Sequence, residues 1–342
     1  MQQHEGQVTI KSIAAALGVS YSTVSKALNG DPRISEPTRQ RVEDKAREMH
    51  YSRNFFAETL RRSDSRIVVI LLNDLDVPAY SEMISVISAD LAAYGYTTII
   101  SDTQFDPESE RNVLEGVLRW RPSAVIYSPA YLKEENLHLL EPYLSRTLFL
   151  GCTGGREDLN AVAVDHRQAG YLSARHMLER GSLGNLILCG SRGYQSADLF
   201  MTGVQDAYGE FGLTADPGWV VRFKPDTDTS CRRFLEFRRA KGSAVTGVIC
   251  FCDHIALGVY KACRELGLSI PGDVSVIGYD DTDPDAFIMP PLTSVHIPRD
   301  LIARHSSRFV TGRLIEGNTD HFSVFLDPYL AVRDSVRPLT DH

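Results

Sequence analysis

Residues 16–30 read ALGVSYSTVSKALNG, a glycine between two short runs whose apolar residues recur at helical spacing. Thr9 can cap the first run as a helix, and Gly18 can end it because glycine tolerates the left-handed backbone of a tight turn. Ser20 can then cap a second helix. Two short helices joined by a glycine turn predict a helix-turn-helix.

A third helix is expected from Ser35, with Pro37 in its first turn, to about Met49. The second helix should bury Val24 and Leu28 and leave a polar set pointing outward near its start, where base edges in a major groove would lie. This set is Tyr21, Ser22, Ser25 and Lys26. The spacing alone leaves an ordinary three-helix bundle with a solvated face as an equal alternative.

The run VTIKSIAAALGVSYSTVSKALNGDPRISEPTRQRVEDKAREMHYSRN, residues 8–54, resembles the DNA-binding head of LacI/GalR-family transcriptional regulators. The resemblance implies three base-reading residues: Tyr21, Ser22 and Lys26. It implies a second set that holds phosphates or braces the recognition helix: Thr9, Ser20, Thr23, Ser25 and Asn29. The family usually has arginine where Lys26 stands. Lysine cannot make arginine's two-point fork to guanine, so a weaker or different base preference is expected there.

Residues 52–65, SRNFFAETLRRSDS, follow the head, which is expected over residues 1–51. By the same resemblance this segment is a hinge helix that wedges a leucine into the minor groove. Its expected contact residues are Asn54, Ala57, Leu60 and Arg61. The family often has proline where Arg53 stands here, and a generic basic linker is the alternative interpretation.

The chain has 342 residues and a net charge of −8, of which residues 1–63 carry +3 and the remainder −11. A slightly basic head on an acidic body fits a nucleic-acid reader attached to something else. The N-terminus lacks the basic start and apolar core of a secretory signal, and no apolar run is long enough to span a membrane, so a cytoplasmic location is expected. All six cysteines are expected to be buried free thiols.

From Arg66 onward, short β-rich runs alternate with amphipathic helical stretches. The expected strands are RIVVILL, TTIIS, AVIYS, TLFLG, AVAVD, NLILCG, WVVRF, GVICF, VSVIGYD and SVHIP. Near-continuous apolar strands in this alternation predict parallel sheets covered on both faces. About ten strands are too many for one compact unit of this size, and two α/β lobes are therefore expected. Ligands of such folds bind at the carboxyl ends of the strands.

An effector-binding and dimerisation domain is expected over residues 66–342. Residues 66–335 of it resemble the periplasmic-binding-protein-like effector domain of the same family, through the segments VAVDHRQAGYLSARHMLERG, DHIALGVYKACRELGLSIPGDVSVIGYDDTD and PPLTSVHIP. The fold class is therefore a small all-α helix-turn-helix domain followed by a two-lobed α/β domain with parallel sheets. The resemblance implies three crossings between the lobes. It places residues 66–163 and 297–321 in the first lobe, and 164–296 and 322–342 in the second.

The same resemblance implies the partners. They are palindromic double-stranded operator DNA, a second copy of the chain, and a small-molecule effector such as a carbohydrate or related metabolite. No membrane, cofactor or metal is expected.

The effector pocket is expected at positions that the resemblance places in the cleft. Asp280, which closes the strand VSVIGYD, would accept hydrogen bonds from ligand hydroxyls or, alternatively, cap the following turn. Tyr80 would stack on the ligand or, nearly as well, lie in the core. The other expected pocket residues are Tyr127, Ser128, Arg192, Ser196, Phe200, Cys252 and Asp253.

Two of these residues depart from the family pattern. Phe200 stands where the family often has arginine, and Cys252 where it often has asparagine. Both changes remove polar groups that would grip a sugar. The pocket should therefore be more apolar than a typical sugar site, with Arg192 as a replacement donor.

No nucleophile-base pair, phosphate-binding loop or metal-ligand spacing is evident, and His166 and His176 are interpreted as surface or satisfied histidines. The leading hypothesis is a DNA-binding transcriptional regulator, in this family usually a repressor, whose operator affinity an effector controls. One alternative is a small-molecule binding or sensory module that reads no DNA. Another is an α/β enzyme that uses Asp280 and Asp281 as acid and base.

Overall fold

The computed structural model describes residues 8–51, 65–75 and 78–338, and the chain divides between residues 64 and 65 into two compact units. The expected hinge residues Asn54, Ala57, Leu60 and Arg61 lie outside the described residues. Within the described ranges, no helix combines the length and apolar character needed to cross a bilayer.

The described part of the first unit folds as three helices, which are α1 (Ile10–Leu17), α2 (Tyr21–Leu28) and α3 (Glu36–Glu48). The Thr9 hydroxyl accepts a hydrogen bond from the Ser12 backbone N–H at 3.3 Å, and Gly18 ends α1 in the left-handed conformation with φ 66°. Ser20 caps α2 in the same way, with the Thr23 N–H at 3.1 Å. These caps confirm the helix-turn-helix.

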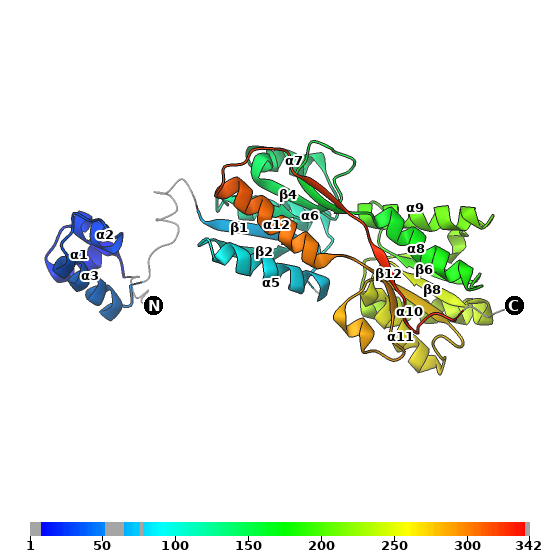
Figure 1. Ribbon diagram of the computed structural model, residues 1–342. Helices are drawn as coiled ribbons and strands as arrows, with labels where there is room; N and C mark the ends of the chain where they lie inside the picture. The colour runs from blue at the N-terminus through cyan, green and yellow to red at the C-terminus, as the bar shows by residue number, and fades with distance from the viewer. Residues whose placement is uncertain (1–7, 52–64, 76–77, 339–342) are drawn as a thin grey trace. The chain divides into compact units, whose positions relative to one another are not determined.

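The second unit is built on two sheets, seen side by side in Figure 1. The strands of the first sheet are β1 (Ile67–Leu72), β2 (Thr97–Asp102), β3 (Ala124–Tyr127), β4 (Thr147–Gly151), β5 (Ala161–Val164) and β11 (Ser323–Leu326). Those of the second are β6 (Asn185–Cys189), β7 (Val220–Arg222), β8 (Gly247–Cys250), β9 (Ser275–Asp280), β10 (Thr293–His296) and β12 (Tyr329–Ala331). All pair in parallel except β12, which is antiparallel to β10.

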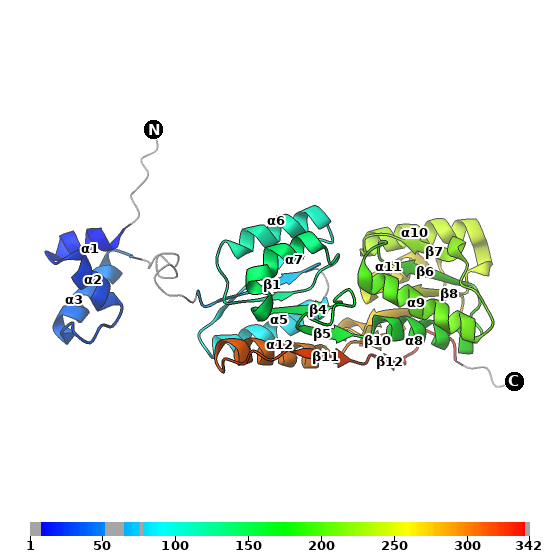
Figure 2. The same cartoon turned by 90° about the horizontal axis from the view of Figure 1, so that it is seen from above.

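Helices cover the sheets of both lobes (Figure 2). The first lobe contains α5 (Pro78–Ala92), α6 (Pro107–Leu118), α7 (Glu134–Leu140) and α12 (Arg299–Leu314). The second contains α8 (His166–Glu179), α9 (Gln195–Glu210), α10 (Thr227–Lys241) and α11 (Asp253–Leu266). The predicted fold class, a helical head followed by a two-lobed α/β unit, is confirmed.

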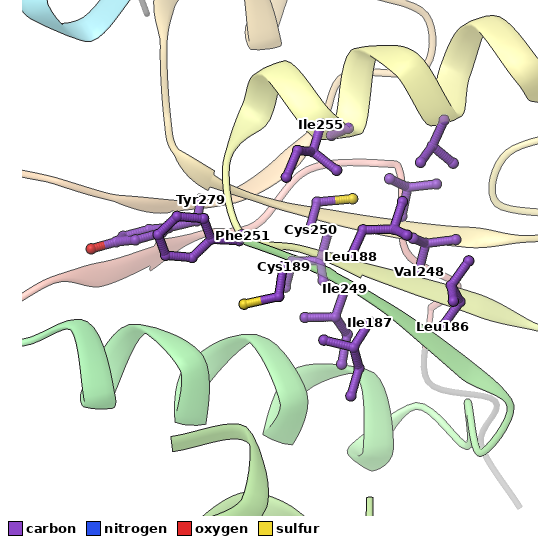
Figure 3. Packing of buried hydrophobic residues seen from close by; sticks show 14 of the residues in the cluster. Leu186, Ile187, Leu188, Cys189, Val248, Ile249, Cys250, Phe251, Ile255 and Tyr279 are labelled. Carbon is purple, nitrogen blue, oxygen red and sulfur yellow. The ribbon is translucent and has the colours of Figure 1, made fainter. Parts of the chain in front are cut away.

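The side chains of β1 show why its sequence is apolar throughout. Val68, Ile70 and Leu72 pack with α5 and α12, and the alternate residues Ile67, Val69 and Leu71 pack with α6 and α7. All six are buried because helices cover both faces of the sheet. The second lobe has one continuous core, in which β6 and β8 supply residues from Leu186 to Cys189 and from Val248 to Cys250 (Figure 3).

The two sheets share one strand order, β2-β1-β3-β4-β5 in the first lobe and β7-β6-β8-β9-β10 in the second. In both, the order reverses next to the first strand of the lobe, and in such sheets the ligand crevice lies at this point, outside the carboxyl ends of the strands. Each lobe therefore has one edge where a ligand can bind, at the carboxyl ends of its strands.

The chain passes between the lobes after β5, after β10 and after β11. The third crossing corrects one expected boundary. Residues 322–326 were expected in the second lobe, but Ser323–Leu326 forms β11 and pairs with β5 in the first sheet. The sequence pattern missed β11 and β12 because both are short edge strands, of four and three residues, whose side chains are largely exposed.

Two glycines let α8 and α9 approach closely. A Cβ at Gly203 would lie 1.8 Å from the carbonyl oxygen of Arg167, and a Cβ at Gly170 would lie 1.9 Å from that of Phe200. No side chain can fit at such distances without separating the helices. Gly209, near the end of α9, has no atom within 4 Å of its Cβ position.

We expect Gly203→Ala to destabilise the second unit by about 1–3 kcal/mol, since overpacking forces the helices apart. Urea unfolding followed by the fluorescence of Trp120 and Trp219, both in this unit, measures the change. The control is Gly209→Ala on the same helix, which should be neutral or stabilise by up to ~1 kcal/mol through helix propensity. Equal stability of the two variants would contradict the close α8–α9 contact.

Candidate functional site

The start of α2 presents an exposed polar strip. Tyr21 is 50% exposed, and Ser22 and Lys26 are exposed beside it. The Ser20 hydroxyl lies 2.8 Å from the hydroxyls of both Ser22 and Thr23, so the first turn is tied together by short polar side chains. Exposed polar groups at the N-terminal end of such a helix suit contact with base edges.

The expected support residues of the head lie around this strip. Thr9 and Ser20 are exposed helix caps, Asn29 is exposed after α2, and Thr23 is half-buried. Ser25, which the pattern placed on the outward face, is instead 8% exposed. This expectation was wrong because α2 packs against both α1 and α3, so its buried face is wider than one apolar stripe.

A cavity of about 120 Å³ lies at the carboxyl ends of the strands, where the two lobes meet. The first lobe contributes residues that follow β1, β2 and β3, the ends of β4 and β5, and the starts of α5 and α12. The second contributes residues that follow β6, β7 and β8, together with the end of β9. Five of the expected pocket residues line it, namely Tyr80, Ser128, Ser196, Cys252 and Asp280.

Four expected pocket residues do not line the cavity. Tyr127 points from β3 to the opposite face of the sheet, among the core residues under α6 and α7, and its hydroxyl donates to Glu110 Oε1 at 2.6 Å. Tyr127 was predicted in the pocket but does not line it, because successive strand residues point to opposite faces of the sheet. Its neighbour Ser128 does line the cavity.

Arg192 is exposed at the surface and supplies no donor to the cavity. Phe200 is fully buried behind the cavity wall, stacked on Tyr279 with ring centroids 5.7 Å apart. Asp253, the first residue of α11, is also buried behind the wall. Its carboxylate accepts hydrogen bonds from Ser294 Oγ at 2.7 Å and the Thr282 N–H at 3.3 Å, so its contacts hold the turn after β9.

Several residues that line the cavity were not predicted from the sequence. Asn73, directly after β1, accepts a hydrogen bond from the Tyr80 hydroxyl at 3.0 Å and donates to the Tyr194 hydroxyl at 3.1 Å. These two hydrogen bonds connect the lobes, since Asn73 and Tyr80 belong to the first lobe and Tyr194 belongs to the second. The position of Asn73 after a buried strand was a usable signal, whereas nothing local marks Tyr194.

His166 also lines the cavity, so its interpretation as a surface or satisfied histidine was wrong. Its Nδ1 lies 2.6 Å from the Tyr279 hydroxyl, and its buried Nε2 has no hydrogen-bond partner among the described residues. Burial lowers the pKa of His166 to about 4, so the ring is neutral at pH 7. His176 is buried too, and burial lowers its pKa to about 4.

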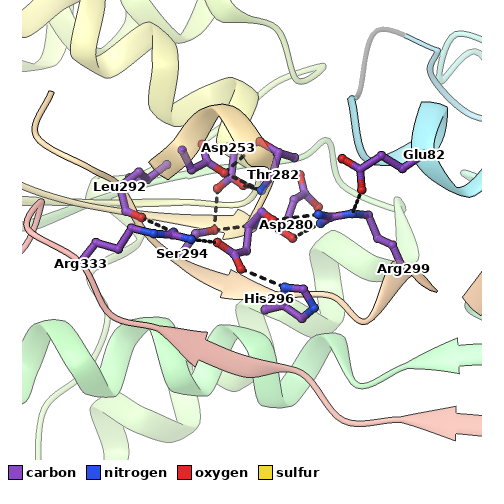
Figure 4. Close-up of polar contacts among 11 residues, drawn as sticks. Glu82, Asp253, Asp280, Thr282, Leu292, Ser294, His296, Arg299 and Arg333 are labelled. Carbon is purple, nitrogen blue, oxygen red and sulfur yellow. Dashed lines mark hydrogen bonds and ion pairs between the residues drawn. The ribbon is translucent and has the colours of Figure 1, made fainter. Parts of the chain in front are cut away.

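Arg299, at the start of α12, connects the lobes beside the cavity (Figure 4). Its Nε donates to Glu82 Oε2 at 3.1 Å in the first lobe. Its Nη1 and Nη2 donate to the backbone carbonyls of Asp280 and Asp281 in the second, at 2.5 and 2.9 Å. We call these contacts the Arg299 bridge. Arg299 was not predicted, because its partners are distant in the sequence.

The turn held by the bridge has an unusual backbone. Asp280 and Asp281 have φ angles of 141° and 57°, a region that side chains other than glycine rarely occupy. The Asp281 carboxylate is fixed by His296 Nδ1 at 2.9 Å and Arg333 Nη2 at 2.5 Å (Figure 4). His296 directly precedes the second crossing and Arg333 follows the third, so the turn is tied to both.

The Asp280 side chain faces the cavity from this turn. Burial raises the pKa of its carboxyl group to about 7, an effect that Arg299 opposes and Asp285 reinforces. Asp280 therefore holds a proton through much of the range in which an exposed aspartate is ionised. The carboxyl group can donate as well as accept near neutral pH.

The two units together define a class of protein, in which a helix-turn-helix head accompanies a two-lobed unit with a ligand-sized cavity. Residues 9–54 match the family model described as bacterial regulatory proteins, lacI family, and residues 174–336 match the model of a periplasmic binding protein-like domain. The chain thus carries the DNA-binding domain of the lacI family together with a periplasmic binding protein-like domain. It is a DNA-binding transcriptional regulator with an effector-binding unit and not an enzyme.

Relatives and solved structures match along nearly the whole chain. The HTH-type transcriptional repressor PurR of Haemophilus influenzae (strain PittEE) is 27% identical over 336 residues, 97% of this chain and 99% of the relative. A LacI-family regulator from Silicibacter pomeroyi has a TM-score of 0.84 at 22% identity, covering 96% of this chain and 100% of that one. A lac repressor dimer bound to operator and an anti-inducer has a TM-score of 0.76 at 23% identity, covering 96% and 99%.

The raised pKa of Asp280 gives stability a pH dependence with a definite sign. Between about pH 4 and pH 7 the folded state binds this proton and the unfolded state does not, so the free energy of unfolding falls as pH rises, by about 1.4 kcal/mol per pH unit. Asp280→Asn removes this contribution. The stability of the variant relative to the natural protein should rise across that range and level off above pH 7.

Urea unfolding at pH 4.5, 6 and 8 measures the difference. The control is Asp90→Asn, an exposed aspartate on α5 with no ion pair among the described residues, which keeps Asp280 and therefore the fall in stability from pH 4.5 to pH 8. A stability difference between Asp280→Asn and the natural protein that does not change with pH would show that the Asp280 carboxyl group has no raised pKa.

Proposed function

We propose that the chain is a cytoplasmic repressor that binds a palindromic operator as a homodimer and changes its operator affinity when a small molecule enters the cavity between its lobes. The observation that carries the proposal is the cavity itself. Both lobes wall it, and the Arg299 bridge spans them at Asp280, a residue of its lining. The relatives named as PurR repressors support repression as the regulatory effect.

The exposed strip on α2 supports DNA reading by Tyr21, Ser22 and Lys26. Lys26 is exposed in the last turn of α2, and no ion pair holds it within the described residues, so its ammonium group can reach a guanine or a phosphate. Thr9, Ser20, Thr23 and Asn29 lie at helix ends around the strip, where they can hold phosphates. Ser25, on the buried face of α2, would brace the helix.

A homodimer follows from the size of the head, because one helix-turn-helix covers only a half-site. The lac repressor structure of similar fold is a dimer on its operator. On the second unit of this chain, Phe287 and Met289 are 81% and 85% exposed, two large apolar side chains almost adjacent in sequence. Apolar surface of this kind marks an interface, and we assign it to the second copy.

Switching needs a part of the protein that has two arrangements and is biased by the ligand. The turn of Asp280 and Asp281 fits this role. It lines the cavity, it has an unfavourable backbone, and it is bound by Arg299 from the opposite lobe. A ligand that engages the Asp280 carboxyl group would change how well this turn fits the bridge, and with it the angle between the lobes.

Lys26→Ala should weaken binding to the operator by about 1–3 kcal/mol and relax sequence preference, because a base contact is lost. Fluorescence anisotropy on operator and on random DNA at one stated salt concentration measures both effects. The control is Lys45→Ala on α3, which removes the same charge from a lysine that pairs with Glu48. Equal losses on both DNAs would remove Lys26 from the base-reading set.

Arg299→Lys should loosen the two lobes, since an ammonium group cannot donate to Glu82 and two carbonyls in the geometry of the guanidinium fork. Spin labels at exposed Asp90 on α5 and Arg239 on α10 report the inter-lobe distance, whose distribution should broaden in the variant. Arg313→Lys on the same helix is the control, because Arg313 donates to the carbonyls of Ser145 and Asn318 within the first lobe. An unchanged distribution in Arg299→Lys would exclude the bridge as the inter-lobe contact.

A further inference from the structure

Most polar atoms around the cavity are already bound to one another. Asn73 uses its amide oxygen for Tyr80 and its amide nitrogen for Tyr194. Arg299 is occupied by Glu82 and the carbonyls of Asp280 and Asp281. A ligand rich in hydroxyl groups would have to break these contacts or leave its own hydroxyls without partners, and both are unfavourable in a buried site.

The lining also includes the hydroxyls of Ser128 and Ser196, and two further polar groups have hydrogen-bonding capacity left for a ligand. One is the Asp280 carboxyl group, which lines the cavity and keeps accepting capacity. The other is His166 Nε2, which is buried and has no partner among the described residues. The contact between His166 Nδ1 and the Tyr279 hydroxyl fixes the orientation of the ring. Both tautomers of the ring leave Nε2 able to form one further hydrogen bond.

The rest of the wall is apolar and largely aromatic. The rings of Phe105 and Phe251 meet that of Tyr194 edge to face, with centroids 5.0 and 5.6 Å away. The cavity is also lined by aliphatic side chains and one thioether side chain: Met83, Leu150, Val164, Ile297 and Ile302. A ring bound here can take an edge-to-face or offset geometry against its neighbours, which aromatic pairs prefer.

Phe200 and Cys252 act in the same direction. Phe200 supports Tyr279 and Phe251 from behind, with ring centroids 5.7 and 5.5 Å away. Cys252 lines the cavity with a thiol whose pKa burial raises well above its ordinary value, so it stays uncharged. Both positions therefore reinforce an apolar wall.

The size of the cavity limits the ligand further. Its volume of about 120 Å³ is slightly below the roughly 150 Å³ of an engineered apolar cavity that binds benzene. One six-membered ring with a small substituent is the scale that fits. Disaccharides and nucleosides are too large for this arrangement of the lobes.

We propose that the effector is a monocyclic aromatic compound with a hydrogen-bond donor, a hydroxyl or ammonium group, directed at Asp280 and a second polar atom directed at His166 Nε2. This inference rests on the proposed function, because it names the chemical class of the molecule that fills the same cavity. It replaces the carbohydrate that the family resemblance implies.

Isothermal titration calorimetry on the full-length protein tests the class without any substitution. The probes are benzyl alcohol, benzylamine, D-glucose and adenine, the last being bicyclic. At least one benzyl compound should bind at least tenfold more tightly than D-glucose and adenine. Tighter binding of D-glucose or adenine, or binding by none of the four, would overturn the inference.

Variants then locate the bound probe. Asp280→Asn should weaken the better benzyl compound at least tenfold, whereas Asp228→Asn on the surface of α10 should leave it unchanged. Among the three hydroxybenzyl alcohols, one isomer should bind more tightly than benzyl alcohol, and His166→Phe should abolish that advantage. Unchanged affinities in both cavity variants would place the probe elsewhere and contradict the assignment.

Operator affinity measured with each probe separates this inference from the proposed function. A sugar that binds and shifts operator affinity would preserve the effector-controlled regulator and overturn the aromatic class. A benzyl compound that binds in the cavity without any shift would preserve the class of ligand and contradict the switch.

Discussion

The Arg299 bridge is the contact on which the arrangement of the second unit depends. Arg299, a residue that is only 9% exposed, is held by Glu82 on one lobe and by two backbone carbonyls on the other. Its planar fork of donors suits this task, since one group serves three acceptors in fixed directions. Because the two carbonyls belong to a turn with left-handed φ angles, the bridge stabilises a backbone conformation that would otherwise be unfavourable.

The bridge also explains how a small ligand can have a large effect. Asp280 presents its side chain to the cavity and its carbonyl to Arg299, so one residue senses the ligand and contacts the opposite lobe. Asp281, its neighbour, is bound by residues next to two of the three crossings. A shift of this turn therefore reaches the connections between the lobes directly, without a long chain of intermediate contacts.

Local signals predicted the head and the strands well. The caps Thr9, Ser20 and Gly18 act within four residues of their own positions, and all ten expected strands of the second unit form. The pocket was predicted only in part. Tyr127 and Ser128 differ by one residue and face opposite sides of the sheet, a distinction that needs the register. Arg299 and Tyr194 reach the cavity through the packing of one lobe on the other, which no local pattern records.

The family resemblance and the side chains around the cavity indicate the same class of protein but different ligands. The family pattern indicates which positions face the cleft, but the chemistry there depends on the side chains present. In this chain Phe200 lies behind the cavity wall, against Tyr279, and His166 lines the cavity. The result is a small, mostly apolar cavity in which Asp280 and His166 keep hydrogen-bonding capacity for a ligand, in a regulator whose DNA-binding domain matches that of its relatives.

The central claim is that this chain reads DNA as a dimer under the control of its cavity. Selection of DNA from a randomised pool by the full-length protein, at stated salt and with or without a metabolite extract, tests it most directly. A dimer controlled by its cavity should enrich a palindrome with two half-sites, at a level that the extract changes. Absence of any enriched sequence under both conditions would contradict it.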